Sequence, residues 1–254
     1  MSTEVLSSMK GNHILKFRKI NKHLIDSLVH SQLYFALPEQ LNDPFDCQVD
    51  IEKALQNAIS QSSDWKRDIL QSLQDDDRLR KEINHRQQDL KNHGVFSSAR
   101  KASLHSSLMW THYADNHKGI CLIYDIPESF IHGDTNHIYG IANVIYGTNG
   151  LTEWFKKLPE NCSIHTNAFW EMVKVRMIIK DACWEYEKEM RILRRISGLQ
   201  TIEQSYLQHI CFGLNTPDSE MTLIRRIIDK FGYDVAFSKM QRTGNDCEIQ
   251  PVDE

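Results

Sequence analysis

The sequence predicts an α+β fold, with a mixed or mostly antiparallel sheet flanked by helices. Apolar segments with strand-like alternation are interspersed with amphipathic helical segments, and no regular strand–helix–strand repeat connects them. Hydrophobic residues make up 41 % of the chain and charged residues 25 %, which is typical of a globular domain. A length of 254 residues is compatible with one large domain, so we expect residues 1–254 to form a single domain.

The chain is expected to begin with a strand, a helix and a second strand. Residues 14–20 alternate in part between apolar and basic side chains, which favours a strand. Asn21 is suited to cap the helix that follows. The apolar face of that helix would carry Leu24, Ile25, Leu28 and Val29. Residues 33–36 indicate a short strand that ends before Pro38.

Residues 50–92 are polar and predict a helical insert or lid. Between residues 64 and 91, seven acidic side chains balance seven basic ones, which is typical of solvated helices. The apolar side chains at helical spacing are the expected buried stripe: Leu55, Ile59, Trp65, Ile69, Leu70 and Leu73.

The middle of the chain predicts three strands and a short helix. Residues 94–98 favour a strand that runs into a loop, and residues 106–115 favour the helix. Residues 119–126 are strongly apolar and predict a central strand. We expect residues 138–146 to pair with that central strand.

The segment after residue 160 predicts a helix followed by two strands. Residues 163–180 carry apolar side chains at helical spacing. Residues 185–193 alternate between polar and apolar side chains, which predicts a strand, and residues 207–212 predict another.

The C-terminal segment has clear signals for one more helix. Thr216 is placed to cap it, Pro217 would occupy its first position and Gly232 would stop it. Residues 235–238 predict a last strand. Residues 241–254 are expected to form a loose tail.

The overall charge and the cysteines exclude some classes of protein. A formal net charge of −4 does not favour a strong nucleic-acid footprint. The cysteines form no Cys-x-x-Cys pair and several lie in apolar runs, so we expect reduced thiols and a cytoplasmic location. No apolar run approaches the ~20 residues that a membrane span needs, so no membrane partner is expected.

The first group of chemically active residues is the Met-Trp-Thr-His-Tyr-Ala-Asp-Asn-His-Lys-Gly block at 109–119. Trp110 and Tyr113 lie three residues apart, so they could equally be core residues on one helix face. The histidines of the block, together with His105, do not have the spacing of zinc ligands. We therefore expect no metal.

The second group is the Trp-Glu-Tyr-Glu-Lys-Glu-Met-Arg block at 184–191. On a strand, Glu185, Glu187 and Glu189 would point to one face. Two interpretations stay open for three stacked carboxylates: an edge strand kept from aggregating by its charge, or a pair of carboxylates for sugar chemistry. An oxocarbenium-like transition state needs a fixed anion and a group that holds a ribose hydroxyl, and one Glu-x-Glu step can supply both.

Together, these motifs resemble those of a widespread bacterial family of unknown function. That pattern consists of a Leu-Tyr-Phe strand, an Asn-Asp-Pro-Phe turn, and the two blocks just described, which stand here at 33–35, 42–45, 109–119 and 184–191. The resemblance runs from about Lys16 to Phe237 and so covers most of the chain. Within the turn, we expect Phe45 to be an anchored aromatic side chain.

The order of the motifs is also similar to that of ADP-ribosyltransferases. In those enzymes a basic residue or His on an early strand, a Ser or Tyr on a middle strand, and a late Glu-x-Glu strand surround NAD. Carried onto this chain, the resemblance implies Lys16 or Arg18 in the first place and Ser97, or the 110–113 block, in the second. It implies Glu187 and Glu189 in the third place, with Glu189 as the catalytic carboxylate. The chain departs from the pattern because it has no His-x-Thr on the first strand and no clear Ser-Thr-Ser.

The resemblance therefore implies an NAD-dependent ADP-ribosyltransferase-like toxin or defence effector. Trp110 or Tyr113 would stack on a ring of NAD, and His112 would lie beside them in the nucleotide site. A cognate inhibitor or defence partner fits this function, and the acceptor stays open. The alternatives are a non-catalytic nucleotide- or protein-binding module of a stress or phage-defence system, and a nuclease or phosphate-processing enzyme that uses His112 with Arg191.

Overall fold

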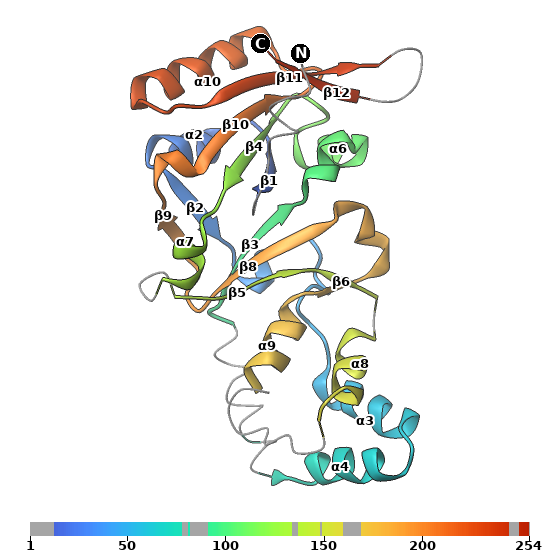
Figure 1. Ribbon diagram of the computed structural model, residues 1–254. Helices are drawn as coiled ribbons and strands as arrows, with labels where there is room; N and C mark the ends of the chain where they lie inside the picture. The colour runs from blue at the N-terminus through green and yellow to red at the C-terminus, as the bar shows by residue number, and fades with distance from the viewer. Residues whose placement is uncertain are drawn as a thin grey trace.

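Eight strands form one sheet through the molecule (Figure 1), in the order β12-β11-β10-β4-β1-β3-β8-β5. In this computed structural model the described residues are 13–77, 81, 91–133, 137–147, 149–159, 169–243 and 249–253. The strands are β1 (His13–Arg18), β3 (Gly94–Ala99), β4 (Ile120–Asp125), β5 (Ile138–Asn143), β8 (Glu189–Arg194), β10 (Leu207–Phe212), β11 (Ala236–Arg242) and β12 (Ile249–Asp253). Within this sheet β10 and β11 run parallel, and the other neighbours are antiparallel. The predicted α+β fold with a mostly antiparallel sheet is confirmed.

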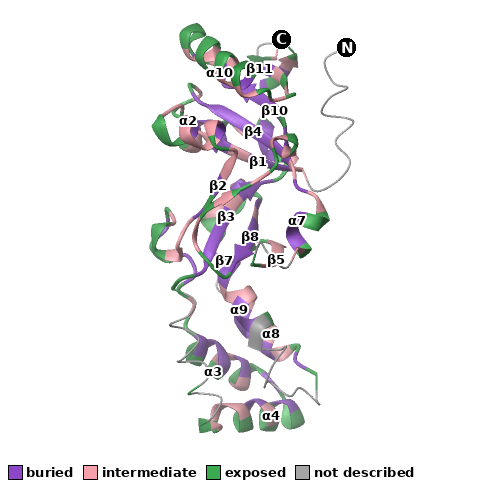
Figure 2. Ribbon diagram, turned by 90° about the vertical axis from the view of Figure 1, so that its left-hand side faces the viewer, coloured by how far each residue is buried: buried purple, intermediate pink, exposed green. Residues whose placement is uncertain are grey.

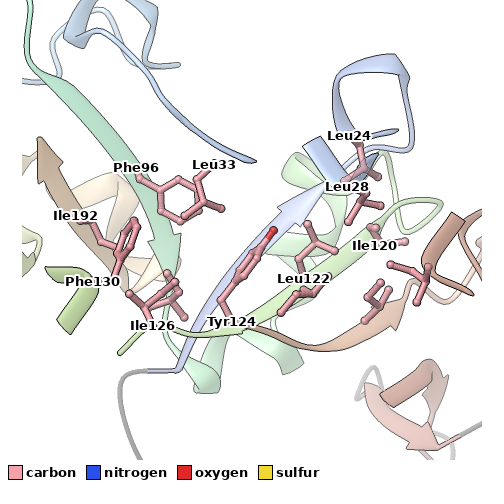
Figure 3. Close-up of a cluster of buried hydrophobic side chains, with 14 of the residues drawn as sticks. Leu24, Leu28, Leu33, Phe96, Ile120, Leu122, Tyr124, Ile126, Phe130 and Ile192 are labelled. Atoms are coloured by element: carbon pink, nitrogen blue, oxygen red, sulfur yellow. The ribbon is translucent and has the colours of Figure 1, made fainter. Parts of the chain in front are cut away.

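Strand β4 is buried because both faces of the sheet are covered at this strand. Ile120 and Leu122 belong to a core cluster with α2 (Lys22–Val29) and α10 (Asp218–Phe231). Figure 3 shows Ile120 and Leu122 together with Leu24 and Leu28 of α2. Cys121 and Ile123 point to the opposite face and pack in a separate cluster. The continuous apolar sequence of β4 follows from burial on two sides.

The expected partner of this central strand was wrong. Strand β5, which covers most of the segment predicted to pair with β4, pairs instead with β8. Both edges of β4 are already occupied, one by β1 in a register that joins Lys16 to Leu122, and the other by β10. Apolar composition identified the strand but carried no information about its neighbours.

The start of α2 and the end of α10 are as the sequence predicts, but the start of α10 is not. The Asn21 side chain accepts a hydrogen bond of 3.0 Å from the Leu24 N–H and so caps α2. Gly232 ends α10 in the left-handed conformation, with φ 74°. Thr216 does not cap α10: its hydroxyl donates to the Gly119 carbonyl at 2.9 Å, and Pro217 takes the N-cap position.

Four helices form a second core at one end of the molecule, below β5 in Figure 1. They are α3 (Ile51–Gln61), α4 (Asp64–Gln74), α8 (Gly150–Lys156) and α9 (Phe169–Met177). Leu55 and Leu70 of the expected stripe are buried in this core, but Trp65 is 53 % exposed. Residues 78–80 and 82–90 of the expected insert lie outside the described residues.

The predicted helix at 163–180 ends earlier than expected. Residues 160–168 lie outside the described part, and α9 stops at Met177. Two short strands, β6 (Ile145–Tyr146) and β7 (Ile179–Lys180), then run parallel to each other. The Gly147 N–H donates to the Lys180 carbonyl at 2.8 Å, so Lys180 is held on a strand and not on a helix.

The loop that precedes α3 starts from a small separate sheet. Strand β2 (Gln32–Phe35) pairs with β9 (Gly198–Thr201), and Ala36 bridges to Val95 of β3. Figure 2 shows β3 and β8 as buried ribbons in the middle of the molecule. The bridge between Ala36 and Val95 therefore places the chain after β2 next to β3 of the large sheet.

The C-terminal segment differs from the loose tail that we expected. Residues 249–253 form β12, which pairs with β11 from Ser238↔Asp253 to Arg242↔Ile249. Ile249 is 7 % exposed, which gives this strand an apolar contact with the core. Residues 244–248 and 254 lie outside the described part. In the portion of the chain that the structure describes, no helix has the length and apolar character needed to cross a membrane.

Candidate functional site

A cavity of about 70 Å³ opens where β1, β3 and β8 lie next to one another. Neighbouring strands are only about 4.8 Å apart, so three adjacent strands direct side chains into one small space. Lys16 of β1, Ser97 of β3 and Glu189 of β8 all contribute to its wall. Its other polar side chains are Asn42, Ser98, Tyr113, Lys180 and Glu187.

The secondary structure that places the two glutamates in the cavity wall differs from the single strand that the sequence predicts. Residues 182–187 form a 3₁₀ helix, η5 (Ala182–Glu187), and β8 begins only at Glu189. Lys188 between them adopts the left-handed conformation, with φ 46° and ψ 49°. Glu185 is exposed on η5, so the expected strand face of three carboxylates was wrong. The edge-strand interpretation was wrong as well, because β8 lies between β3 and β5.

Arg191 is the deepest charged side chain of this region, with 0 % exposure. Its guanidinium makes a bidentate pair with Asp46, at 2.8 and 2.6 Å, and a second bidentate pair with Glu189, at 2.8 and 3.0 Å. A further donor bonds the Met177 carbonyl at 2.7 Å. Arg191 therefore ties the loop before α3, the end of α9 and β8 to one point.

Lys180 lies between the two glutamates. Its ammonium nitrogen is 2.6 Å from Glu187 Oε2, 3.1 Å from Glu189 Oε2 and 3.8 Å from Asp46 Oδ2. It also lies over the Trp184 ring at 4.8 Å from the centroid, a cation–π contact. Lys180 and Asp46 were not predicted from the sequence. The only signal was a charged residue set among apolar neighbours.

Lys16 contributes a third cation to the site. Its ammonium donates to the Ser97 carbonyl and lies over the Phe96 ring at 4.9 Å from the centroid. Burial, followed by the charge of Arg18, lowers the pKa of Lys16 to about 8. The site thus contains three basic and three acidic side chains, which balance: Lys16, Lys180, Arg191, Asp46, Glu187 and Glu189.

The environments of the two glutamates move their pKa values apart. Burial would raise the pKa of Glu189, but the charge and hydrogen bonds of Arg191, with Lys180, lower it to about 2. The pKa of Glu187 is raised by burial, against hydrogen bonds from Lys180 and Tyr113 that favour its charged form. Two carboxylates with divergent pKa values in one cavity are a common feature of sites that carry out chemistry.

Tyr113 and Asn42 close one side of the cavity. The Tyr113 hydroxyl donates to Glu187 Oε1, and the Asn42 side-chain amide donates to the Tyr113 oxygen at 2.7 Å. Burial, and then Glu187, raise the pKa of the Tyr113 hydroxyl. The hydroxyl therefore keeps its proton and donates it in the hydrogen bond to the carboxylate. This chain of hydrogen bonds connects the Asn-Asp-Pro-Phe turn to Glu187.

The rest of that turn is structural except for its aromatic residue. The Asp43 carboxylate accepts hydrogen bonds from the Phe45 N–H at 2.9 Å and from Trp184 Nε1 at 2.8 Å. Phe45 itself is 81 % exposed, so the expectation of an anchored aromatic was wrong. The turn is anchored by its carboxylate and not by its ring.

Most of the 109–119 block serves the fold. Trp110 is fully buried, donates to the Leu104 carbonyl at 2.7 Å and packs edge-on against Phe17. A Cβ on Gly119 would lie 2.3 Å from the Arg18 carbonyl oxygen, so the close approach of two strands requires glycine. The residues between them form a left-handed turn, with φ of 48°, 53° and 67° at Asp115, Asn116 and His117.

The structure brings together five of the eight site residues that the sequence suggested: Lys16, Ser97, Tyr113, Glu187 and Glu189. Arg18 and Trp110 do not contribute to the cavity wall. His112 is exposed outside it, with its ring 5.9 Å from that of Tyr186. Over the described ranges, no group of three or more His, Cys, Asp or Glu side chains is arranged to hold a metal ion.

Comparison with protein families finds a match in the middle of the chain. The family DUF2971, described as a protein of unknown function, is similar to this chain over residues 109–192. The matched segment covers about a third of the chain. It starts at the Met109 block and includes Tyr113, Lys180, both cavity glutamates and Arg191. No curated protein and no solved structure matches the chain.

Proposed function

We propose that this chain is an NAD-dependent, ADP-ribosyltransferase-like protein that acts as a toxin or defence effector in the cytoplasm. One observation carries the proposal. The three strands that the resemblance assigns to the NAD site are β1, β3 and β8, and they are consecutive in the sheet. Lys16, Ser97 and the two glutamates therefore border one cavity, although they are separated by up to 173 positions in the sequence (16 to 189).

The chemistry of the cavity suits a sugar substrate. An oxocarbenium-like ribose needs a nearby anion and a group that fixes a hydroxyl. The two glutamates supply anionic oxygens, and Lys16 and Ser97 supply donors on the adjacent strands. The free thiols of Cys47, Cys121, Cys183 and Cys211 are in keeping with a reducing compartment.

The cavity is open to solvent on one side, and its volume of about 70 Å³ is small beside NAD. The reacting end of NAD would enter between Tyr113 and Lys16, and the remainder would lie outside the cavity. Tyr113 would have to move away from Glu187 together with Asn42 to admit the ribose, because both side chains lie on the wall of the cavity.

The direct test is stabilisation by the ligand. A ligand that binds only the folded state stabilises it by about 2.7 kcal/mol at a hundredfold excess over Kd. We expect millimolar NAD to raise the melting temperature, and ADP-ribose or nicotinamide to raise it less. Expression of the wild-type chain in bacteria should also slow growth if it acts as a toxin. An unchanged melting temperature with all three compounds would overturn the NAD proposal.

One observation favours a second candidate, a non-catalytic nucleotide- or protein-binding module. All of the charged side chains of the site except Lys16 are joined by ion pairs, and such a network can also serve only to hold loops together. NAD binding without nicotinamide release would favour this candidate. The phosphate-processing alternative has less support, because Arg191 is fully buried and His112 lies outside the cavity.

A further inference from the structure

The two cavity glutamates are held in different ways. Glu189 Oε1 accepts from Arg191 Nε at 2.8 Å, and Oε2 accepts from Arg191 Nη2 at 3.0 Å and from Lys180 at 3.1 Å. Arg191 has no exposed surface, and its guanidinium donates to one carboxylate along each of two edges, Glu189 along one and Asp46 along the other. Turning Glu189 toward a substrate would leave a buried guanidinium half-paired, which is strongly unfavourable.

Glu187 has more freedom. It accepts one bond from Lys180 at 2.6 Å and one from the Tyr113 hydroxyl. Both donors themselves border the cavity, so a substrate hydroxyl that enters there can replace Tyr113 without uncovering a buried charge. Tyr113 retains Asn42 as a partner when this happens.

We infer that Glu187 is the carboxylate that acts on the substrate, and that Glu189 is a positioning residue that holds Arg191 and Lys180. This assignment rests on the proposed function, and it reverses the roles that the resemblance implies for the two residues. Lys180 connects them, because it bonds both carboxylates. Glu189 thus orients the ammonium that in turn orients Glu187.

The reaction step is a substitution at the ribose. The bond between C1′ and the nicotinamide nitrogen breaks, and its electron pair leaves with nicotinamide. The positive charge that develops on the sugar faces the Glu187 carboxylate. In the hydrolytic reaction a water oxygen then bonds to C1′, and its proton passes to solvent. The products are nicotinamide, ADP-ribose and one proton.

The test compares matched variants by nicotinamide release, measured per folded molecule. We expect Glu187→Gln to fold with a melting temperature near that of the wild type and to lose roughly a hundred- to a thousandfold in kcat, the scale of losing one charge-stabilising group. Glu189→Gln should lower the melting temperature most, while its folded fraction keeps more kcat than Glu187→Gln. Glu185→Gln, on the exposed face of η5, is the control and should match the wild type in both measurements.

The pH profile of wild-type kcat/KM is a second readout that needs no variant. The pKa of Glu187 is raised and that of Glu189 is about 2. If the Glu187 carboxylate acts on the substrate, kcat/KM should fall with decreasing pH in an acidic limb that lies above the ordinary Glu pKa near 4.3. If Glu189 acts instead, kcat/KM should show no limb in that region.

Nicotinamide release that survives in Glu187→Gln, or a wild-type profile without that limb, would overturn the assignment while the NAD proposal stands. If the wild type neither releases nicotinamide nor is stabilised by NAD, the proposed function fails and the assignment fails with it.

Discussion

Arg191 and Glu189 form a bidentate ion pair in which the guanidinium is fully buried and the glutamate is 5 % exposed. The same guanidinium binds Asp46 with its remaining donors. This arrangement holds Glu189 in place in the cavity wall, because it joins β8 to the loop that precedes α3.

Replacing Arg191 should destabilise the chain severely. Arg191→Met leaves Asp46 and Glu189 as buried carboxylates without their main partner, and breaking such a pair costs about 3–5 kcal/mol. Urea unfolding would measure the loss. The matched control is Arg226→Met on the exposed face of α10, where less than about 0.5 kcal/mol is expected. Equal losses in the two variants would contradict the role of the buried pair.

Acid should remove the contribution of Glu189 to stability. Its folded-state pKa of about 2 lies below the ordinary value near 4.3, so the contribution is complete above about pH 4.3 and is lost as the pH falls toward 2. At about 1.4 kcal/mol per pKa unit this contribution is on the order of 3 kcal/mol. The raised pKa of Glu187 acts in the opposite direction, so the measurement is the difference between wild type and Glu189→Gln in urea unfolding at several pH values. Parallel stability curves for the two proteins would be inconsistent with this account.

Gly119 should not tolerate a side chain. The added Cβ of Gly119→Ala would meet the Arg18 carbonyl oxygen at 2.3 Å, and overpacking of this kind costs about 1–3 kcal/mol. Gly140→Ala is the control, because its nearest neighbour would be the flexible Lys174 side chain at 3.6 Å. We expect thermal unfolding to show a clear loss at Gly119 and almost none at Gly140. A tolerated alanine at Gly119 would mean that β1 and the turn after α6 (Ser107–Tyr113) are less closely packed than described.

Tyr113→Phe should change the pH dependence of activity. The Tyr113 hydroxyl donates to Glu187 and so favours its charged form. Without that bond the pKa of Glu187 should rise further, and the acidic limb of kcat/KM should move to higher pH. The measurement is nicotinamide release across the acidic range. If the limb does not move, the Tyr113 hydroxyl does not affect the pKa of the carboxylate that acts on the substrate.

These relationships define what the sequence could and could not predict. Alternation, caps and apolar runs identified β4, β10, α2 and α10, because those signals depend on local chemistry. Pairing of β5 with β8 and the strand β12 depend on which edges of the sheet remain free, and a single segment carries no information about that.

The site was predicted only in part, because local sequence patterns show some of its residues and not others. The glutamates and Tyr113 stood out as dense functional motifs, whereas Lys180 and Asp46 are single charged residues outside those motifs. Asp46 also lies far in sequence from its partners Lys180 and Arg191. Alternation also predicted an open strand face for the glutamates. The left-handed Lys188 and the ion pairs of Arg191 instead place both carboxylates in the interior.

The central claim is that the cavity between β1, β3 and β8 consumes NAD. The most direct measurement is the amount of nicotinamide that the purified wild-type chain releases from millimolar NAD, quantified over several hours beside Glu187→Gln. The account predicts many nicotinamide molecules released per wild-type molecule and roughly a hundredfold fewer from the variant. No release from the wild type would contradict the central claim, whereas equal release from both proteins would contradict only the role assigned to Glu187.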